Sequence, residues 1–420
     1  MSEKNKKETR YGHMGTTYYF LPTRNLFGED SVKETGSLMQ SLGGKKTLIV
    51  TDAFLAKQGM ARMVQDILKD SGVESVVFGG VEPTPKDVNV EAGLKVFKEN
   101  GCDSIISLGG GSSHDCAKGI GIVASNGGNI RDYEGVDKSQ KPMCPMVAIN
   151  TTAGTASEIT RFCIITDTSR HVKMAIVDWR VTPQIAINDP KLMVGMPPSL
   201  TAATGMDALT HAIEAYVSTA NCDFTDPLAL HAIKMIQNDL VDSYNGDMAK
   251  RDSMHNAQCL AGMAFSNALL GIVHSMAHKT GAAFADYGAH IIHGAANAMY
   301  LPKVIAFNAK DETAKERYCY IADFMGLGGA SADEKVANLI AYLRKMNDDL
   351  NIPHCIKNYG ADSYPTENGF VPEEVFLERL PEIAANAILD ACTGSNPRQP
   401  SQEEMEKLLK CCYYDTEVDF

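Results

Sequence analysis

The stretch GMDALTHAIEAY, residues 205–216, places an aspartate and a histidine four residues apart in a run that otherwise favours an apolar helix. Side chains at positions i and i+4 lie one above the other on a helix, so Asp207 and His211 can point at one place. A buried hydrogen bond or an ion pair on the helix face would explain the pair equally well. The pair alone leaves both interpretations open.

Four histidines follow within twenty residues, in the segment GIVHSMAHKTGAAFADYGAHIIHGAANAMYLP (271–302). They are His274, His278, His290 and His293, and the first two are again four residues apart. A single buried histidine usually serves a core hydrogen bond, but this segment holds four of the 11 histidines in the chain. Because Asp and His donors without a thiolate suit a divalent Fe, Zn or Mn ion, we expect a metal site here.

A second group of residues could bind an anion. Three glycines and two serines stand between the apolar run DSIISL and a small-residue helix: Gly109, Gly110, Gly111, Ser112 and Ser113. Glycines let the backbone approach a ligand closely, and the helix N-terminus offers N–H groups, so the turn could hold a pyrophosphate. The pattern is not the GxGxxG of ordinary dinucleotide-binding folds. The alternative is a tight turn with no ligand.

Two further strand ends favour a nucleotide. The turn NTTAGTASE (150–158) follows another predicted strand, at the carboxyl edge of the sheet where such folds bind their ligands. Asp52 ends the run KTLIVTD, where a carboxylate can accept hydrogen bonds from a ribose diol and would repel a 2′-phosphate. The alternative role for Asp52 is to cap the helix that follows.

Strands and helices must alternate to position these residues. The sequence predicts strands at 46–52, 74–80, 103–111 and 145–152, with helices from about residue 53, at 87–100 and at 114–126. Strands separated by helices of this length predict a doubly wound, mostly parallel α/β sheet with helices on both faces.

The predicted secondary structure changes after PPSLTAATG (197–205). Helical periodicity runs through 225–244, 256–279 and 334–350, and no segment there is convincing as a strand. At 420 residues the chain is too long for one ordinary core. We therefore predict a dinucleotide-binding α/β domain at 1–195 and an all-helical metal-binding domain at 196–420.

Composition narrows the class of protein. The net charge of −13 argues against nucleic acid as a partner, because nucleic acid favours clustered Lys and Arg. The 11 scattered cysteines form no CxxC motif, which is typical of a reduced, cytosolic protein. The polar N-terminus MSEKNKKETRYGHM lacks the apolar core of a signal peptide, and no apolar run is long enough to span a bilayer. These features predict a cytoplasmic protein.

At this point the chain resembles the iron-containing alcohol dehydrogenases, the family of propanediol, lactaldehyde and butanol dehydrogenases. The resemblance covers nearly the whole chain. The matching blocks are FLPTRNLFGEDSV, GGGSSHDCAK, NTTAGTASEITRFCIITD, GMDALTHAIEAY, HSMAHKTG and HGAANAMYLP. The C-terminal block DACTGSNPRQPSQEEMEKLL is similar to that of members acting on short primary alcohols.

For the metal site, the resemblance implies a set of four ligands: Asp207, His211, His274 and His293. His278 matches a further histidine near the substrate that is not normally a ligand. The segment between His278 and His293 is a few residues longer than is common in the family, and His290 within it could replace His293. We prefer His293, because HGAANA continues the family block in register. The longer segment leaves the fine substrate specificity open.

For the cofactor, the resemblance places Gly109 to Ser113 in a pyrophosphate loop and adds four residues at the nucleotide: Thr151, Thr152, Thr155 and Lys173. Lys173 matches a lysine that reaches the cofactor ribose, and Asp52 matches the acid that favours NAD over NADP. The implied protein is an NAD-dependent dehydrogenase of small alcohols or diols that carries Fe(II), with Zn(II) or Mn(II) as alternatives, and forms homodimers or larger homo-oligomers. Cofactor and metal are expected to meet in the cleft between the two domains.

Two other functions remain as alternatives. The architecture also resembles that of dehydroquinate synthase, a lyase in which NAD and a metal serve a redox-neutral cyclisation. A phosphorylated acid substrate would need several basic residues, whereas the segments near the predicted metal site are rich in Ala, Met and Phe. A non-catalytic NAD-binding or assembly protein is disfavoured because all four ligand positions are intact.

Overall fold

The computed structural model describes residues 19–20, 23–170, 172–281, 283–284, 287–362, 365–366 and 369–420. The N-terminal segment 1–14, on which part of the cytoplasmic prediction rests, lies outside the described residues. The chain divides into two compact units. The sheet unit comprises Pro22–Ala208 and Asn238–Gly262, and the helical unit comprises Met1–Leu21, Leu209–Gln237 and Met263–Phe420. The division predicted at residues 195/196 stays a prediction.

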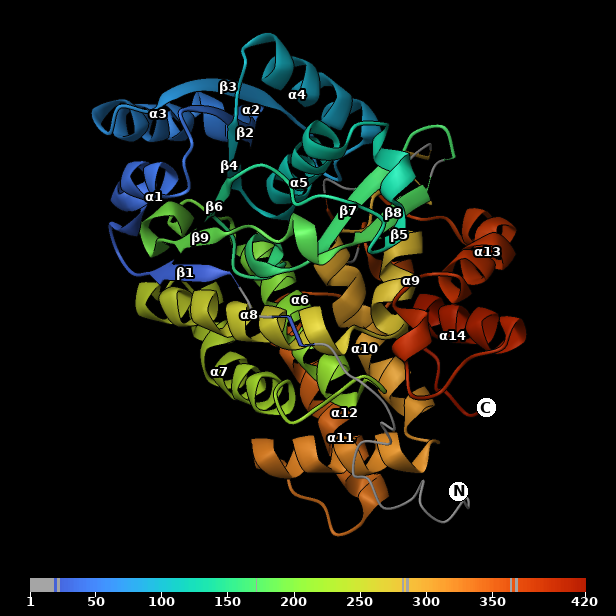
Figure 1. Cartoon of the computed structure of the whole chain (residues 1–420). Coiled ribbons are helices and arrows are strands. Elements are labelled where there is room, and N and C mark those ends of the chain that lie inside the picture. The colour runs from blue at the N-terminus through green and yellow to red at the C-terminus, as the bar shows by residue number, and fades with distance from the viewer. Residues whose placement is uncertain are drawn as a thin grey trace, which may run out of the picture. The chain divides into compact units, whose positions relative to one another are not determined.

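The sheet unit is built on six parallel strands in the order β1-β9-β6-β4-β2-β3 (Figure 1). The strands are β1 (Arg24–Phe27), β2 (Lys46–Asp52), β3 (Glu74–Val81), β4 (Ser104–Gly109), β6 (Met146–Asn150) and β9 (Ile185–Asn188). The helices are α1 (Thr35–Ser41), α2 (Ala53–Lys57), α3 (Met60–Asp70), α4 (Asp87–Glu99) and α5 (Gly111–Asn126). This arrangement confirms the predicted fold class.

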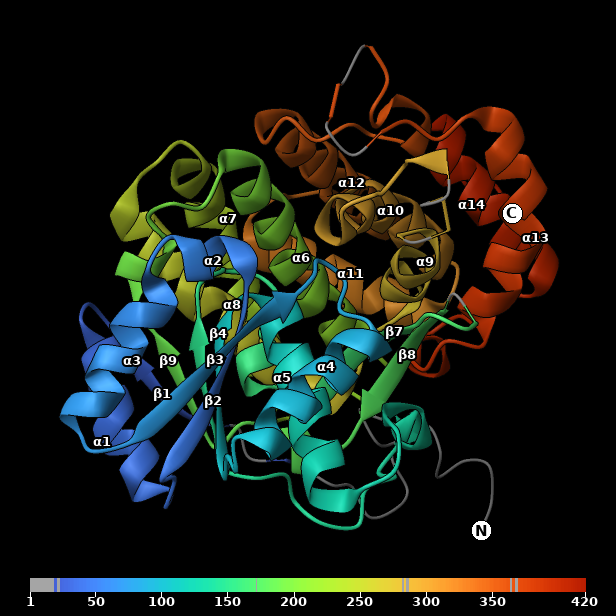
Figure 2. The same ribbon diagram turned by 90° about the horizontal axis from the view of Figure 1, so that it is seen from above.

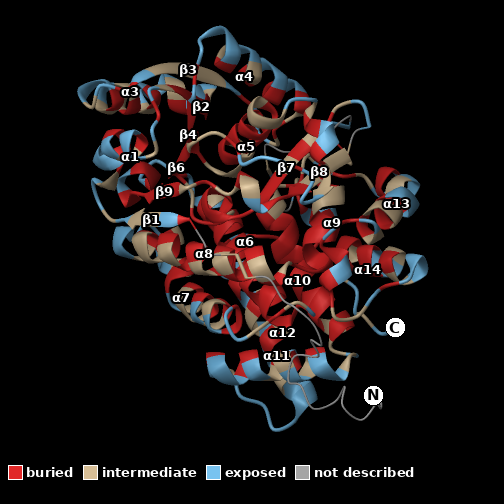
Figure 3. Ribbon diagram, in the orientation of Figure 1, coloured by how far each residue is buried: buried red, intermediate tan, exposed pale blue. Residues whose placement is uncertain are grey.

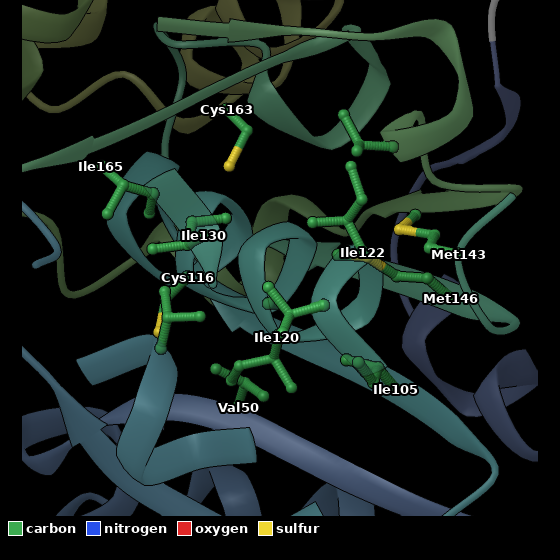
Figure 4. Close-up of a cluster of buried hydrophobic side chains, with 14 of the residues drawn as sticks. Val50, Ile105, Cys116, Ile120, Ile122, Ile130, Met143, Met146, Cys163 and Ile165 are labelled. Atoms are coloured by element: carbon green, nitrogen blue, oxygen red, sulfur yellow. The ribbon is translucent and has the colours of Figure 1, made fainter. Parts of the chain in front are cut away.

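Helices cover both faces of this sheet, with α1 and α3 on one side and α4 and α5 on the other in both views (Figures 1 and 2). Alternate strand residues therefore enter two different apolar clusters. Val50, Ile105 and Met146 pack with Ile120 of α5 (Figure 4). Their neighbours along the strands, such as Ile49, join the cluster on the α1 and α3 side. Strands β4 and β6 are buried along their whole length, as expected for strands covered on both faces.

A second, three-stranded sheet was not predicted from the sequence. It consists of β5 (Gly135–Val136), β7 (Phe162–Asp167) and β8 (Val172–Val177), and β7 and β8 form an antiparallel pair. The helix predicted to start at residue 114 begins earlier, at Gly111, directly after the glycine turn. The glycines thus belong partly to the first helical turn.

The described residues after position 196 contain helices and no strand, as predicted. The helices are α6 (Pro198–Val217), α7 (Asp226–Tyr244), α8 (Met248–Ala268), α9 (Ile272–Thr280), α10 (His293–Asn308), α11 (Glu312–Met325), α12 (Ala332–Asp349), α13 (Glu373–Ile388) and α14 (Gln402–Tyr414). Figure 3 shows α6, α9 and α10 as largely buried helices. The boundaries between the two units fall inside α6, α7 and α8.

The segment 256–279, predicted as one helical run, is divided in the structure. Helix α8 ends at Ala268, Leu269 takes a left-handed φ of 63°, and α9 starts at Ile272. Among the described residues no single helix is long and apolar enough to cross a membrane. Only taken together do helices α8 and α9 have the length and apolar composition of a membrane-spanning segment, and the chain bends by 102° between them.

Candidate metal centre and cofactor site

The glycine turn and the threonine-rich turn lie against each other at the carboxyl edge of the sheet. Gly109 at the end of β4 pairs with Asn150 at the end of β6, and the Thr151 N–H donates to the Gly109 carbonyl at 3.0 Å. A Cβ on Gly110 would lie 2.8 Å from a methyl carbon of Thr152, and one on Gly111 would lie 2.9 Å from that of Thr155. The glycines are therefore also needed for packing between the two turns.

The backbone of the glycine turn is suited to an anion. Gly109 has a φ of +144°, which an L side chain rarely adopts. Gly110 is the N-cap of α5 and, having no side chain, leaves the first N–H groups of the helix without a cap of its own. Ser112 and Ser113 lie in the first turn of the same helix. A helix of 16 residues with its N-terminus at a sheet edge is a favourable place for a phosphate group.

Asp52 stands at the end of β2 and is the N-cap of α2, accepting a hydrogen bond from the Leu55 N–H at 2.8 Å. The alternative role considered from the sequence is thus present in the structure. Capping uses one carboxylate oxygen, Oδ1, so it is compatible with a ribose contact by the other oxygen.

Lys173 lies on β8, opposite Thr166 of β7. Burial raises the pKa of the Asp115 carboxyl, and the ammonium groups of Lys118 and Lys173 oppose that rise. Asp115, in the second turn of α5, accepts through Oδ2 from the Ile164 N–H of β7 at 3.1 Å, two residues before the Thr166 that Lys173 faces. The β7–β8 pair, which was not predicted, is what brings Lys173 there.

Sequence reasoning missed Lys118, which holds the two turns together. Its ammonium is fully buried and donates to Ser157 Oγ at 2.9 Å and to the carbonyls of Thr160 at 3.0 Å and Phe162 at 2.7 Å. Ser157 Oγ donates in turn to Asp115 Oδ1 at 2.6 Å. A lysine three positions after Asp115, directly before the small and apolar residues GIGIV of the same helix, was the available signal.

The candidate metal centre starts from one helix. Asp207 and His211 lie one turn apart on α6, and His274 comes from α9. One potential ligand atom from each residue lies within 4.8 Å of those of the other two, and all three residues are buried. A carboxylate and two imidazoles are donors that divalent Fe, Zn or Mn accepts, so the residues present fit such an ion.

His293, the first residue of α10, lies beside this group. The Asn297 amide nitrogen is 3.2 Å from His274 Nε2 and 3.3 Å from His293 Nε2, so both ring nitrogens approach the same point. The ring centroids of His274 and His293 are 5.3 Å apart. His290 lies in the segment before α10, and within the described part of the chain neither His290 nor His293 is part of the group formed by Asp207, His211 and His274.

His278 belongs to a neighbouring cluster. Its Nδ1 lies 3.2 Å from Asp390 Oδ2, which also accepts from Lys279 Nζ at 2.8 Å. The His278 ring stacks on that of His293 with centroids 5.3 Å apart. Burial raises the pKa of Asp390, but His278 and Lys279 together hold it well below its usual range. Asp390 is the first residue of the C-terminal block DACTGSNPRQPSQEEMEKLL, and its contact with a site residue was not predicted from the sequence.

A doubly wound parallel sheet with a glycine turn, continued by buried helices that gather Asp and His side chains, is the architecture of a metal- and nucleotide-dependent enzyme. Family models agree: residues 22–190 match the model "Iron-containing alcohol dehydrogenase", and residues 201–413 match "Fe-containing alcohol dehydrogenase family, C-terminal". The chain belongs to the iron-containing alcohol dehydrogenase family. The predicted resemblance and the predicted enzyme class are confirmed.

Individual relatives are similar over nearly their full length. An NADPH-dependent butanol dehydrogenase of Clostridium saccharobutylicum is 44% identical over 96% of this chain and 99% of its own. An NAD-dependent methanol dehydrogenase of Bacillus methanolicus is 42% identical over 94% of this chain and 99% of its own. The crystal structure of a 1,3-propanediol oxidoreductase has a TM-score of 0.86 and 40% identity, covering 95% of this chain and 100% of that one.

Proposed function

We propose that this metal-dependent alcohol dehydrogenase transfers hydride between NAD(H) and a small primary alcohol or diol, or the corresponding aldehyde. The observation that carries the proposal is the buried group of Asp207, His211 and His274, because its ligand atoms converge within 4.8 Å in the manner of a divalent metal site. The match to dehydrogenases along the whole chain favours this function over the redox-neutral lyase.

Each proposed site residue has a separate task. When bound, the ion supplies Lewis acidity toward the substrate oxygen, and the nicotinamide supplies the hydride acceptor or donor. Asp207, His211, His274 and His293 would hold the ion, for which we propose Fe(II) over Zn(II) or Mn(II). His278, oriented through Nδ1 by Asp390, would hold or move a proton at Nε2.

The cofactor would be held by the two turns at the sheet edge. The pyrophosphate would lie at the N-terminus of α5, where the chain offers the backbone of Gly109 to Gly111 and the hydroxyls of Ser112 and Ser113. Thr151, Thr152 and Thr155 would orient the nucleotide from the second turn. Lys173 and Asp52 would contact its ribose hydroxyls.

The metal assignment is tested by comparing His211→Ala with His278→Ala. We expect His211→Ala to lose metal and activity while its dissociation constant for NAD stays close to that of the wild type. His278→Ala should keep stoichiometric metal and lose turnover by roughly 10²–10⁴-fold, because only a proton-transfer group is removed. Elemental analysis and NAD titration by fluorescence give both readouts.

A second pair of variants decides the fourth ligand. His293→Ala should lower metal content, and His290→Ala should leave it unchanged. Full metal content in His211→Ala would contradict the ligand set as a whole. Metal loss in His290→Ala but not in His293→Ala would exchange these two residues.

The substrate class is tested with a panel of short alcohols, diols and aldehydes on protein reconstituted separately with Fe(II), Zn(II) and Mn(II). Net NADH formation from a simple primary alcohol is the expected result, whereas turnover without net NADH would favour the lyase.

We also propose a cytoplasmic homodimer or larger homo-oligomer. All 11 cysteines are free thiols, as a reducing compartment would maintain them, and light scattering on the purified protein measures the oligomer.

A further inference from the structure

Glu214 on α6 contacts the candidate ligand His274 directly. It follows Asp207 by seven residues and His211 by three, so it lies on the same face of the helix. Glu214 Oε2 lies 2.6 Å from His274 Nδ1, and Oε1 accepts a hydrogen bond from the Val273 N–H at 2.8 Å. Glu214 and His274 are both buried. One helix thus supplies two proposed ligands and the hydrogen-bond partner of a third.

The start of α9 fixes this carboxylate from a second direction. The N-cap Gly271 supplies no side-chain cap, and side chains from distant parts of the chain accept from the first N–H groups: Asn396 from Ile272 at 3.3 Å and Glu214 from Val273. A Cβ on Gly271 would lie 2.7 Å from Asn396 Oδ1 and 2.7 Å from Glu214 Oε1. Glycine at this position leaves room for both acceptors.

The contacts also decide which nitrogen of His274 carries hydrogen. Glu214 Oε1 already accepts from a backbone N–H, and a carboxylate oxygen accepts, so the contacts fit a hydrogen on Nδ1 that is donated to Oε2. Nε2 is then an acceptor. The Asn297 amide nitrogen, 3.2 Å from Nε2, fits that assignment independently.

We propose that Glu214 is a positioning residue of the metal centre: it holds His274 in the tautomer and ring orientation that present the Nε2 lone pair to the ion. The inference rests on the proposed function, because it requires His274 to be a ligand. Carboxylates that accept from the second nitrogen of a ligating histidine orient the ring and raise its basicity. The rival role for Glu214 is to cap α9 and nothing more.

Glu214→Gln tests the proposal with little change in volume. Its amide oxygen can still accept from the Val273 N–H, but its amide group then turns toward His274 Nδ1 and favours the tautomer with hydrogen on Nε2. We expect the dissociation constant for Zn(II), measured by competition with a chromophoric chelator, to rise about 10- to 100-fold. The d–d absorption of the Co(II)-loaded full-length protein should change as well, which a purely structural role would not require.

Asn396→Ala is the matched control, because it removes the other side-chain acceptor at the start of α9 without a contact to His274. We expect it to lower the melting temperature of the metal-free protein and to leave the Zn(II) dissociation constant within about twofold of the wild-type value. Equal weakening of Zn(II) binding in Asn396→Ala and Glu214→Gln, at equal loss of melting temperature, would overturn the proposal in favour of capping.

Gly271→Ala provides a second variant if Glu214→Gln does not fold. Its methyl group would displace the Glu214 carboxylate while keeping the charge, so Zn(II) binding should again weaken. Wild-type affinity in either variant overturns the role of Glu214. If the wild-type protein itself binds no Zn(II), Fe(II) or Co(II), the proposed function fails instead, so the two failures are distinguishable.

Discussion

At the residue scale, membership of the family does not by itself fix the choice between NAD and NADP. The butanol dehydrogenase relative is NADPH-dependent and the methanol dehydrogenase relative is NAD-dependent, at 44% and 42% identity. Asp52 is where this chain places a carboxylate, and its Oδ1 is engaged as the cap of α2. A 2′-phosphate beside it would meet like charge at close range, which costs several kcal/mol at a binding site.

Replacing Asp52 separates its two roles. Asp52→Asn keeps a good N-cap but removes the charge, so we expect kcat/KM with NADP to rise by at least tenfold while the melting temperature stays near the wild-type value. Asp52→Gly should also admit NADP and should weaken NAD, since no acceptor for the ribose remains. Steady-state kinetics with both cofactors give the ratio. If the ratio of kcat/KM for NAD to kcat/KM for NADP is unchanged in both variants, Asp52 only caps α2 and does not select the cofactor.

At the element scale, Asp415 at the end of α14 ties together three helices of the helical unit. It accepts from Lys303 of α10 at 2.8 Å and from both terminal nitrogens of Arg344 on α12 at 2.7 and 2.8 Å. Burial raises the pKa of Asp415, but the hydrogen bonds from Arg344 and Lys303 outweigh it and lower the pKa from 3.8 to about 2. The ionised form is therefore the one that stabilises the fold.

This lowered pKa predicts a pH dependence of stability. A carboxyl whose pKa is lower in the folded state contributes stability above its unfolded pKa, about 4, and loses it as the pH falls toward about 2. Asp415→Asn should therefore destabilise the metal-free protein at pH 7, and its deficit against the wild type should shrink below about pH 4. Urea unfolding at several pH values measures both. A deficit that stays constant down to pH 3 would contradict the role of ionised Asp415.

At the scale of the whole molecule, a metal ion that binds only the folded chain must raise its stability. The gain is RT ln(1 + [L]/Kd), about 2.7 kcal/mol at a free concentration one hundred times Kd. Removing metal with a chelator should therefore lower the melting temperature by roughly 3 °C for a chain of 420 residues. Calorimetry on wild type and His211→Ala measures the effect. An equal response in His211→Ala would mean that the chelator acts elsewhere than at the proposed site.

The sequence by itself determined those secondary structure elements and side-chain spacings that depend only on neighbouring residues along the chain. Short strand-like and helix-like stretches placed β2, β3 and α4 within a residue or so of their bounds, because such signals depend on neighbours along the chain. The pairing of Asp207 with His211 was equally local, since a helix sets the spacing of i and i+4 side chains. The assignment to the iron-containing alcohol dehydrogenase family came from several motif blocks together, and the family match confirms it.

Tertiary structure decided which distant residues meet. The run 256–279 was predicted as continuous helix, but in the structure it breaks at Leu269, and the first N–H groups of α9 donate to Glu214 and Asn396, which lie far away in sequence. The contact between Gly110 and Thr152 likewise follows from the neighbouring places of β4 and β6 in the sheet. Packing between elements decides which residue a carboxylate in an apolar helix contacts. The local periodicity of the sequence carries no information about that contact.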